Sequence, residues 1–349
     1  MKAVVYSSHT FEKELLAKAN QKKHDITLIS NPLSLETAFF AEGKDAVIVF
    51  ITDDVSAPVI AKLKSQGVRY IATRSFETDH IDREAASLAG MKVANIPFYA
   101  PEGLAEYALT LMLSLSRKVV LAASRSKQFD FSLKDLQGFS LNGKTVGIVG
   151  LGEVSKVLIR LLKAFGCKVL VYDLSLEIDI EGVEVVGLEQ LLGSSDIVSL
   201  HAPLKSYNQH VINDQTLAFF KKGAILINTS HGGLVDSKAV LEALKSGKIG
   251  GFAADVYEFE RNLFFEDHSR DVIKDSMLEE LMALPNVIIT PHQGFLTDET
   301  LQGIAIQTIK NLDKWQANKC AGKACACANS CQNKEKDHPH SSDDKNQNK

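Results

Sequence analysis

The main body of the chain nearly lacks cysteine. Of the five cysteines among 349 residues, four lie after residue 319, and only Cys167 belongs to the main body. This scarcity excludes a disulfide framework for the main body. A reducing compartment, the cytoplasm, is therefore the expected location.

Long apolar runs and an excess of one charge are also missing. No apolar run reaches the roughly 20 residues that a membrane-spanning helix requires, and the first residues predict a strand rather than a signal peptide. The 39 Lys and Arg are mixed with 43 Asp and Glu, which gives a formal net charge of -4. Such a mixture creates no field that would attract nucleic acid or an anionic membrane. We therefore expect a small-molecule ligand.

The apolar content of 45% is enough for a sizeable core and about two domains. Short runs rich in Val and Ile alternate with helical patterns from Lys2 almost to Trp315. This alternation is typical of parallel sheets with crossover helices, so the predicted fold class is α/β. In the first hundred residues we predict strands over 2–7, 25–30, 45–50, 69–74 and 92–95, and helices over 12–20 and 57–66.

A second α/β unit follows a proline-flanked boundary. Pro97 and Pro101 precede a long apolar helical segment, and we place the domain crossing there. Strands are predicted at residue 144 and near residues 168, 196, 224, 251 and 287, and an amphipathic helix over 297–315 closes the globular part. After Asn318 the chain becomes rich in Lys, Asn, Ser, Asp and His. This composition predicts a disordered tail over residues 319–349.

Residues 146–155 have the pattern of a dinucleotide-binding turn between a strand and a helix. Gly150 permits the tight turn and Gly152 lets the backbone approach a pyrophosphate at the positive end of the helix. Ser155 stands where a third glycine is usual. Asp173 ends the next strand, where a carboxylate receives a ribose hydroxyl, and no Arg follows to take a 2′-phosphate. A turn that binds no phosphate would explain the glycines, but the whole arrangement favours NAD.

Three later segments, 228–236, 254–260 and 291–295, place polar residues after predicted strands. Ligands of open α/β sheets bind at these strand ends. Together with the glycine turn, the order and spacing of the segments resemble the D-isomer-specific 2-hydroxyacid dehydrogenases, and the D-lactate dehydrogenases are the most similar members. The resemblance covers residues 2–315.

The resemblance implies a Rossmann NAD-binding domain, residues 100–294, inserted in a flavodoxin-like substrate domain made of residues 1–99 and 295–318. It also implies a homodimer, to which the helix near Pro101 contributes. The implied reaction is hydride transfer between NAD and a D-2-hydroxy acid, with D-lactate and pyruvate as the expected pair.

The family's general acid is a histidine paired with a carboxylate, and the matching residues are His292 and Glu260. Reduction of a keto group needs a proton on oxygen as hydride reaches carbon, which suits an imidazole. Glu260 would orient the ring and stabilise its charged form. By the same resemblance, three residues line the substrate pocket: Glu77, Tyr99 and Phe295. The residues expected to contact NAD are Gly150, Gly152, Glu153, Val154, Asp173, Ala202, Pro203, Asn208, Thr229, Ser230 and Asp255.

Two positions depart from the family pattern. His231 stands where the family has Arg, whose guanidinium fork holds the substrate carboxylate and polarises the carbonyl. An imidazole offers at most two donors. If each charge-assisted bond contributes about 1.5–3 kcal/mol, losing two would slow the reaction roughly a hundred- to several-thousand-fold. Glu77 replaces a glycine whose region binds the substrate carboxylate, and its charge would repel an anion.

Three interpretations of His231 follow. The protein is a working dehydrogenase in which His231 itself, Arg74 or Arg261 replaces the lost clamp; or its substrate has changed; or it binds NAD(H) as a sensor or interaction protein with little turnover. We favour the first two jointly because His292 and Glu260 are retained.

Metal binding has two candidate sites, and no metal ligand is assigned in the globular part. Histidine and carboxylate are zinc ligands, but the family pattern explains three of the four residues in the first candidate without a metal: His231, His292, Asp255 and Glu260. The tail is a cluster of soft ligands for Cu(I) or Zn, without zinc-finger spacing; a solubilising tail with reduced thiols is the alternative. Its members are Cys320, Cys325, Cys327, Cys331, His338 and His340.

Overall fold

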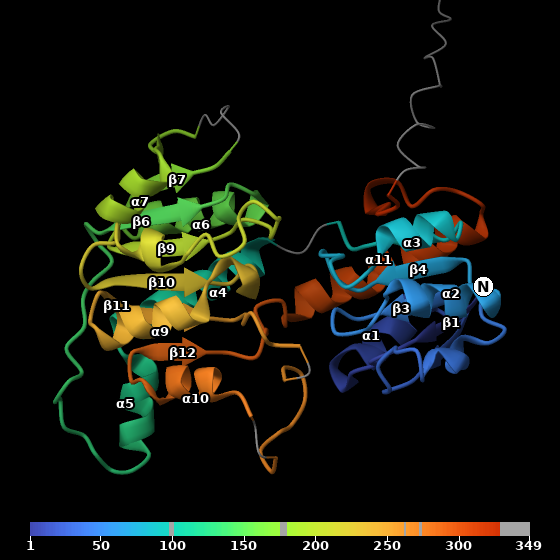
Figure 1. Ribbon diagram of the computed structural model, residues 1–349, viewed down its shortest axis with the longest axis horizontal. Coiled ribbons are helices and arrows are strands. Elements are labelled where there is room, and N and C mark those ends of the chain that lie inside the picture. Colours follow the sequence, from blue (N-terminus) through green and yellow to red (C-terminus); the bar gives the residue numbers. More distant parts are fainter. Residues whose placement is uncertain (98–100, 175–179, 262, 272–273, 329–349) are drawn as a thin grey trace, which may run out of the picture. The chain divides into compact units, whose positions relative to one another are not determined.

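The structure is a computed structural model that describes residues 1–97, 101–174, 180–261, 263–271 and 274–328 (Figure 1). The chain divides into two compact units, one of Met1–Tyr99 with Asp298–Lys349 and one of Ala100–Thr297. Both units contain a parallel sheet with crossover helices, so the predicted α/β class is confirmed. The chain re-enters the first unit at Asp298, whereas the family resemblance implied residue 295 for this point.

The first unit has a five-stranded sheet in the order β2-β1-β3-β4-β5. This is the flavodoxin-like order. Every residue of the two strands that follow β1 in this order is buried, because helices cover both faces of the sheet. The strands are β1 (Lys2–Val5), β2 (Asp25–Leu28), β3 (Ala46–Val49), β4 (Tyr70–Thr73) and β5 (Lys92–Ala94).

One face of this sheet packs against η1 (Ala38–Ala41), α2 (Ala57–Ser65) and α3 (Arg83–Leu88). The other face packs against α1 (Thr10–Asn20) and α11 (Asp298–Gln316). Trp315, near the end of α11, is 2% exposed and stacks on Tyr70 with ring centroids 4.9 Å apart. The last long helix therefore completes the core of the first unit.

Residues 319–328, here called the C-terminal strap, pack along β5. The backbone N–H of Asn95 donates to the carbonyl of Ala324 (2.9 Å), and that of Ala326 donates to the carbonyl of Val93 (3.0 Å). Cys327 Sγ accepts from the N–H of Val93 at 3.3 Å. The predicted disorder from residue 319 is therefore wrong for the strap. Small Ala and Cys side chains give little apolar signal, but they fit a sheet edge whose backbone groups need partners.

The second unit has a seven-stranded parallel sheet in the order β12-β11-β10-β9-β6-β7-β8. This is the Rossmann order with one added strand. The strands from β12 to β7 are labelled in Figure 1. The sequence analysis did not predict β8, because this two-residue strand is exposed and has no apolar pattern. The strands are β6 (Thr145–Val149), β7 (Lys168–Tyr172), β8 (Glu184–Val185), β9 (Ile197–Leu200), β10 (Ala224–Asn228), β11 (Ile249–Ala254) and β12 (Val287–Ile289).

Helices pack on both faces of this sheet. One core contains residues of α4 (Pro101–Ser116) and α6 (Glu153–Ala164). The other contains residues of α7 (Leu188–Ser194), α8 (Asp214–Leu217), α9 (Ser237–Lys245) and α10 (Ser276–Ala283). Among the described residues no single helix is long and apolar enough to cross a membrane, although α4 and α5 (Val119–Ser126), bent by 63°, pass that test as a pair by length and composition.

Candidate active site

The glycine turn joins β6 to α6. Gly150 has φ 95°, and a Cβ there would lie 2.6 Å from the backbone nitrogen of Ala202, so only glycine fits. Gly152 is the N-cap of α6, and a Cβ there would meet nothing within 4 Å. The turn therefore packs tightly on its inner side and leaves the N-terminus of α6 approachable, as a bound pyrophosphate requires.

Ser155 and Asp173 both bind the glycine turn. The buried Ser155 hydroxyl donates to the carbonyl oxygen of Gly150 at 2.7 Å, so serine replaces the usual third glycine without opening the packing of the helix on the strand. The Asp173 carboxylate accepts from the N–H of Leu151 at 2.6 Å. The acid expected to receive a ribose hydroxyl is thus fixed beside the turn, and the residues present fit a dinucleotide.

The loop after β9 lies next to this turn, and the loop after β10 is hydrogen-bonded to the loop after β9. Asn208 closes the first loop, since its side chain accepts from Lys205 N–H (2.7 Å) and donates to the carbonyl of Pro203 (2.9 Å). The Ser230 hydroxyl donates to the carbonyl of Ala202 at 2.7 Å. These bonds give Asn208 and Ser230 a role in shaping the loops, and their contacts with the cofactor stay predictions. The other predicted contacts are the half-buried Val154 and Thr229 and the exposed Glu153, which pairs with Lys156.

His292 and Glu260 meet at the carboxyl end of the same sheet. Nδ1 of His292 lies 2.9 Å from Oε1 of Glu260, and the other carboxylate oxygen accepts from the N–H of Tyr257 at 2.9 Å. The two side chains are 21% and 23% exposed. Glu260 is therefore anchored to the backbone and orients the ring, so that Nε2 is the nitrogen able to face a substrate.

Two aromatic rings flank the imidazole. Phe265 lies 5.7 Å from His292 between ring centroids, and Phe295 packs edge-on at 6.4 Å. Apolar neighbours strengthen the bond between His292 and Glu260 by limiting water. The contact of Phe295 with substrate stays a prediction.

Asp255, 2% exposed, holds the turn that carries His292. Its carboxylate accepts from the hydroxyl of Thr290 (2.6 Å) and from the N–H groups of Gln293 (2.9 Å) and Gly294 (2.7 Å). Burial raises the pKa of Asp255, while these donors act in the opposite direction. The predicted role beside the nicotinamide is untested, and the geometry adds a positioning role that the sequence did not suggest.

His231 follows β10 and presents one ring nitrogen to its own loop. Nδ1 accepts from the N–H of Gly233 at 3.0 Å, so the neutral ring carries its proton on Nε2. A Cβ on Gly232 would lie 2.2 Å from the carbonyl carbon of Tyr257, so the loop runs directly against that residue. His231 thus offers a single N–H where the family pattern has a guanidinium fork.

Asn228 is a site-forming residue that the sequence analysis did not single out. It is 1% exposed, its side-chain amide donates to the carbonyl of His231 (2.9 Å), and its oxygen accepts from the N–H of Ser230 (3.1 Å). The available signal was an amide that ends a wholly apolar strand, because a buried amide needs partners.

The hypothesis that Arg74 replaces the missing arginine is wrong. The side chain lies in the first unit, 1% exposed, and its guanidinium pairs with Glu12 and donates to the carbonyl oxygens of Tyr6, Ser7 and Val49. Each nitrogen of the guanidinium is committed to the fold.

Other candidates are placed as follows. Arg261 is exposed and adjacent to Glu260 in the chain, so it stays a candidate cation. Glu77 is half-buried in the first unit, and its carbonyl accepts from the Ser75 hydroxyl at 2.7 Å. Tyr99 lies outside the described residues.

The two metal hypotheses gain no support. The oxygens of Asp255 and Glu260 already accept bonds from backbone N–H groups, which a metal ion would have to displace. Among the described residues, the cysteines of the strap are half-buried and form no disulfide: Cys320, Cys325 and Cys327. Three ligands of the proposed soft cluster lie outside the described residues: Cys331, His338 and His340.

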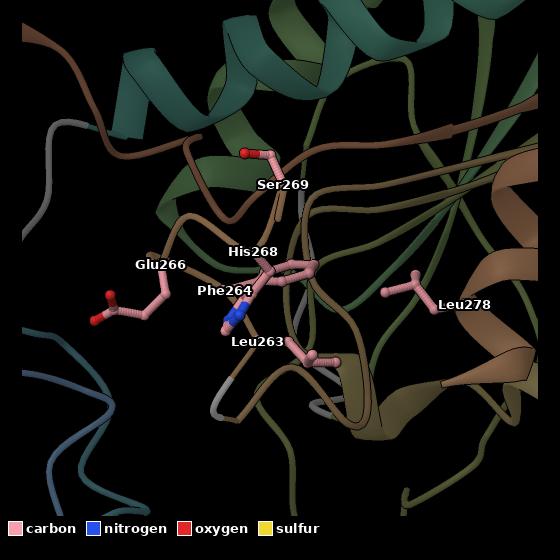
Figure 2. A pocket seen from close by; sticks show the side chains of 6 residues that line it. All are labelled: Leu263, Phe264, Glu266, His268, Ser269 and Leu278. Atoms are coloured by element: carbon pink, nitrogen blue, oxygen red, sulfur yellow. The ribbon is translucent and has the colours of Figure 1, made fainter. Parts of the chain in front are cut away.

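A pocket of about 270 Å³ is lined mainly by residues that follow Glu260 in the chain (Figure 2). The first lining residues, Leu263 and Phe264, both donate backbone N–H groups to the carbonyl of Glu260. None of the predicted site residues lines the pocket, which is bounded by Leu263, Phe264, Glu266, His268, Ser269 and Leu278. The segment that follows Glu260 therefore forms part of the pocket wall, but the His292 ring does not.

Comparisons with known proteins agree with this geometry. The family model described as D-isomer specific 2-hydroxyacid dehydrogenase, NAD binding domain, matches residues 109–294, more than half of the chain. A D-lactate dehydrogenase of Escherichia coli (strain K12) is 41% identical over 331 residues, which cover 93% of this chain and 98% of that protein. A solved structure of the pyruvate reductase of Chlamydomonas reinhardtii is similar with a TM-score of 0.87 and 37% identity, covering 92% of this chain and 98% of that one. An aromatic 2-oxoacid reductase of Clostridium sporogenes is 35% identical, over 90% of this chain and 96% of that protein.

Proposed function

Because the chain belongs to the D-isomer specific 2-hydroxyacid dehydrogenases, an NAD-dependent family, we propose that it interconverts pyruvate and D-lactate. One observation carries this proposal: the pair of His292 and Glu260, 2.9 Å apart, is held at the carboxyl end of the same sheet that carries the glycine turn. A protein that no longer did chemistry would not need this pair.

The glycine turn would hold NADH, which when bound would supply the hydride for reduction of the keto carbon. His292 donates the proton from Nε2 to the carbonyl oxygen, and the carboxylate of Glu260 stabilises the charged ring beforehand. Asp255 keeps the backbone of the His292 turn in place. In the reverse direction His292 takes the proton from the hydroxyl group.

His231 sets the expected level of activity. The single N–H of His231 would bind the substrate carboxylate where arginine would offer two charged N–H groups. At least about one charge-assisted hydrogen bond is therefore lost, and each such bond contributes about 1.5–3 kcal/mol to binding. We therefore expect pyruvate turnover below that of a member with arginine, and we propose Arg261 as the cation that compensates in part. A 2-keto acid with a larger side chain, bound through that side chain, is the alternative substrate.

A second candidate function rests on the same residue. Since Nδ1 of His231 is used by Gly233, a protein that binds NAD(H) as a sensor, with little turnover, also fits the loss of the clamp. Binding of NADH without oxidation of any 2-hydroxy acid would favour this candidate.

The deciding experiment measures NADH oxidation with pyruvate and a panel of 2-keto acids, for the natural protein and for His231→Arg. Under our proposal the natural protein turns over, and His231→Arg raises kcat/KM at least ten-fold. NADH fluorescence titration of both proteins is the control for an intact cofactor site. NADH binding without turnover, restored by arginine, would instead mark a disabled enzyme.

We also propose that two copies associate through the second unit. The helix α5 contains no buried residue, and several large apolar side chains after it are 72–85% exposed: Phe129, Phe131 and Leu133. Sedimentation velocity should give a dimer, and changing Phe129 and Phe131 to Ser together should shift the protein to monomer. A cytoplasmic location is part of this proposal, supported by the scarcity of cysteine in the main body.

A further inference from the structure

The backbone of His292 adopts an unfavourable conformation. Its φ is 53°, in the left-handed region that residues other than glycine rarely occupy. Such a conformation persists only when the surrounding structure holds it. The direction of the imidazole therefore depends on what fixes residues 290–294 on either side of it.

Two elements hold this turn, and α4 is the less obvious one. Asp255 binds the turn from β11, as described above. From α4, the hydroxyl of Tyr107 accepts from the side-chain amide of Gln293 at 2.9 Å. Residue 293 follows His292 directly, so this bond acts one residue from the general acid.

The turn also lies directly against the surface of α4. A Cβ on Gly294 would meet Cδ1 of Tyr107 and Cδ2 of Leu104, each at 3.3 Å, and Oδ2 of Asp255 at 3.1 Å. Glycine at this position lets the backbone approach both the tyrosine ring and the aspartate. Tyr107 consequently contacts the turn with its ring edge as well as with its hydroxyl.

The surroundings of the Tyr107 hydroxyl keep it protonated. Burial raises the pKa of Tyr107 and the negative charge of Asp255 raises it further, while the hydrogen bonds with Thr290 and Gln293 act in the opposite direction. A neutral hydroxyl that accepts from Gln293 still has its own proton to donate on the side of Asp255. Phenylalanine would retain the ring contact and lose both polar functions.

We propose that Tyr107 is a positioning residue for the general acid: with Gln293 and Asp255 it clamps the 290–294 turn between α4 and β11 and so fixes the orientation of His292. No part of this role requires Tyr107 to touch the substrate. The inference rests on the proposed function for its catalytic consequence, and on the turn geometry alone for its structural one.

The test compares Tyr107→Phe with Tyr70→Phe, which removes the hydroxyl of a tyrosine packed on Trp315 in the first unit. We expect Tyr107→Phe to lower kcat on the order of ten-fold, to leave KM for NADH unchanged, and to move the pH profile of kcat. Tyr70→Phe should change none of these. An unchanged kcat and pH profile in Tyr107→Phe would overturn the proposal, even if thermal stability fell.

A double-mutant cycle isolates the bond itself. Gln293→Met removes the other partner of the same hydrogen bond, so the double variant Tyr107→Phe/Gln293→Met should be hardly slower than the worse single variant. Fully additive effects would show that the two residues act separately and would contradict the clamp.

NMR of the His292 ring separates failure of this inference from failure of the proposed function. In the full-length protein, the His292 Cε1–H signal should shift or split in Tyr107→Phe and stay in place in Tyr70→Phe, with no need for turnover. If the natural protein reduces no 2-keto acid while this signal still responds, the proposed function fails and the clamp stands. If the signal does not respond, the clamp is refuted whatever the activity.

Discussion

The carboxyl edges of the two sheets carry similar residues and use them differently. In the first unit, Arg74 and Glu12 form an ion pair with side chains 1% and 7% exposed, and the guanidinium also donates to three backbone carbonyls. In the second unit, His292 and Glu260 form a pair of the same kind, but both side chains are about one-fifth exposed. The first pair is buried, and the second is partly exposed.

The difference teaches how to separate structural from functional charges at strand ends. Asp53, beside the first pair, is fully buried and accepts from Ser7, Leu33 and Phe50, so it serves the fold only. Asp255 is almost as buried, but its three donors belong to the turn that presents His292. Polar residues after a strand are therefore insufficient evidence for a site, and the accessibility of one group among them is decisive.

Removing the partly exposed imidazole should lower catalysis strongly and spare the fold. We expect His292→Gln to lower kcat by about 10²- to 10⁴-fold, the usual contribution of a general acid. The free energy of unfolding should change by less than about 1 kcal/mol, because the side chain is partly exposed and glutamine can still reach Glu260. Steady-state kinetics and urea unfolding of the same preparation test both halves. A large loss of stability would show that the pair of His292 and Glu260 serves the fold, as the pair of Arg74 and Glu12 does.

Removing the buried guanidinium of Arg74 should instead destabilise the fold. Arg74→Met leaves the Glu12 carboxylate buried without its partner, which costs about 3–5 kcal/mol. Urea unfolding measures this loss, and Glu12→Gln added to Arg74→Met should restore part of it. The matched control is Arg69→Met, since Arg69 pairs with Asp45 at 2.8 Å on the surface and such pairs contribute about 0.2–1 kcal/mol. Equal effects of the two arginine changes would contradict the distinction.

The pH dependence of the free energy of unfolding extends the comparison to a third histidine, His201. His201 follows β9, and burial lowers its pKa to about 4, against about 6.5 in the unfolded chain. Between these values the unfolded state binds the extra proton, so the free energy of unfolding is highest above pH 6.5 and falls as the pH approaches 4. The full shift corresponds to about 3 kcal/mol, and partial exposure reduces our expectation to roughly 1–2 kcal/mol.

Urea unfolding at pH 7 and pH 5 measures the effect of His201. The difference between the two pH values should shrink in His201→Gln, which can keep the bond to the Ser199 hydroxyl, 2.8 Å from Nε2. His24, whose pKa burial also lowers, adds a slope in the same direction. If the free energy of unfolding of His201→Gln fell as steeply between pH 7 and pH 5 as that of the natural protein, the His201 ring would have to be protonated in the folded state as well.

The smallest expected effect concerns β5, the edge strand of the first sheet, which the C-terminal strap covers. Cys327→Ala removes the acceptor for the N–H of Val93, at a cost of about 1 kcal/mol or less. Hydrogen exchange at the Val93 and Ala326 amides should become several-fold faster, while Cys320→Ser, before the bonded stretch, leaves it unchanged. Equal protection in both variants would mean that the strap is held by its alanines alone.

Several features of this protein could be predicted from the sequence alone. Runs of Val and Ile identify strands because parallel sheets are covered on both faces, and the glycine turn with Asp173 identifies the cofactor because a pyrophosphate needs that local geometry. The family, the α/β class and NAD were all correct. The resemblance also predicted the pair of His292 and Glu260, and the 2.9 Å contact between them joins residues 32 positions apart, which no local pattern determines.

Only the tertiary structure decided how each polar group is used. The sequence could not tell that Arg74 is consumed by the core, that His231 gives Nδ1 to Gly233, or that the strap covers β5. Local sequence sets which residues end a strand and which backbone angles are possible. The partners of a buried donor or acceptor come from segments distant in the chain, so charge, exposure and tautomer are determined only when those segments pack together.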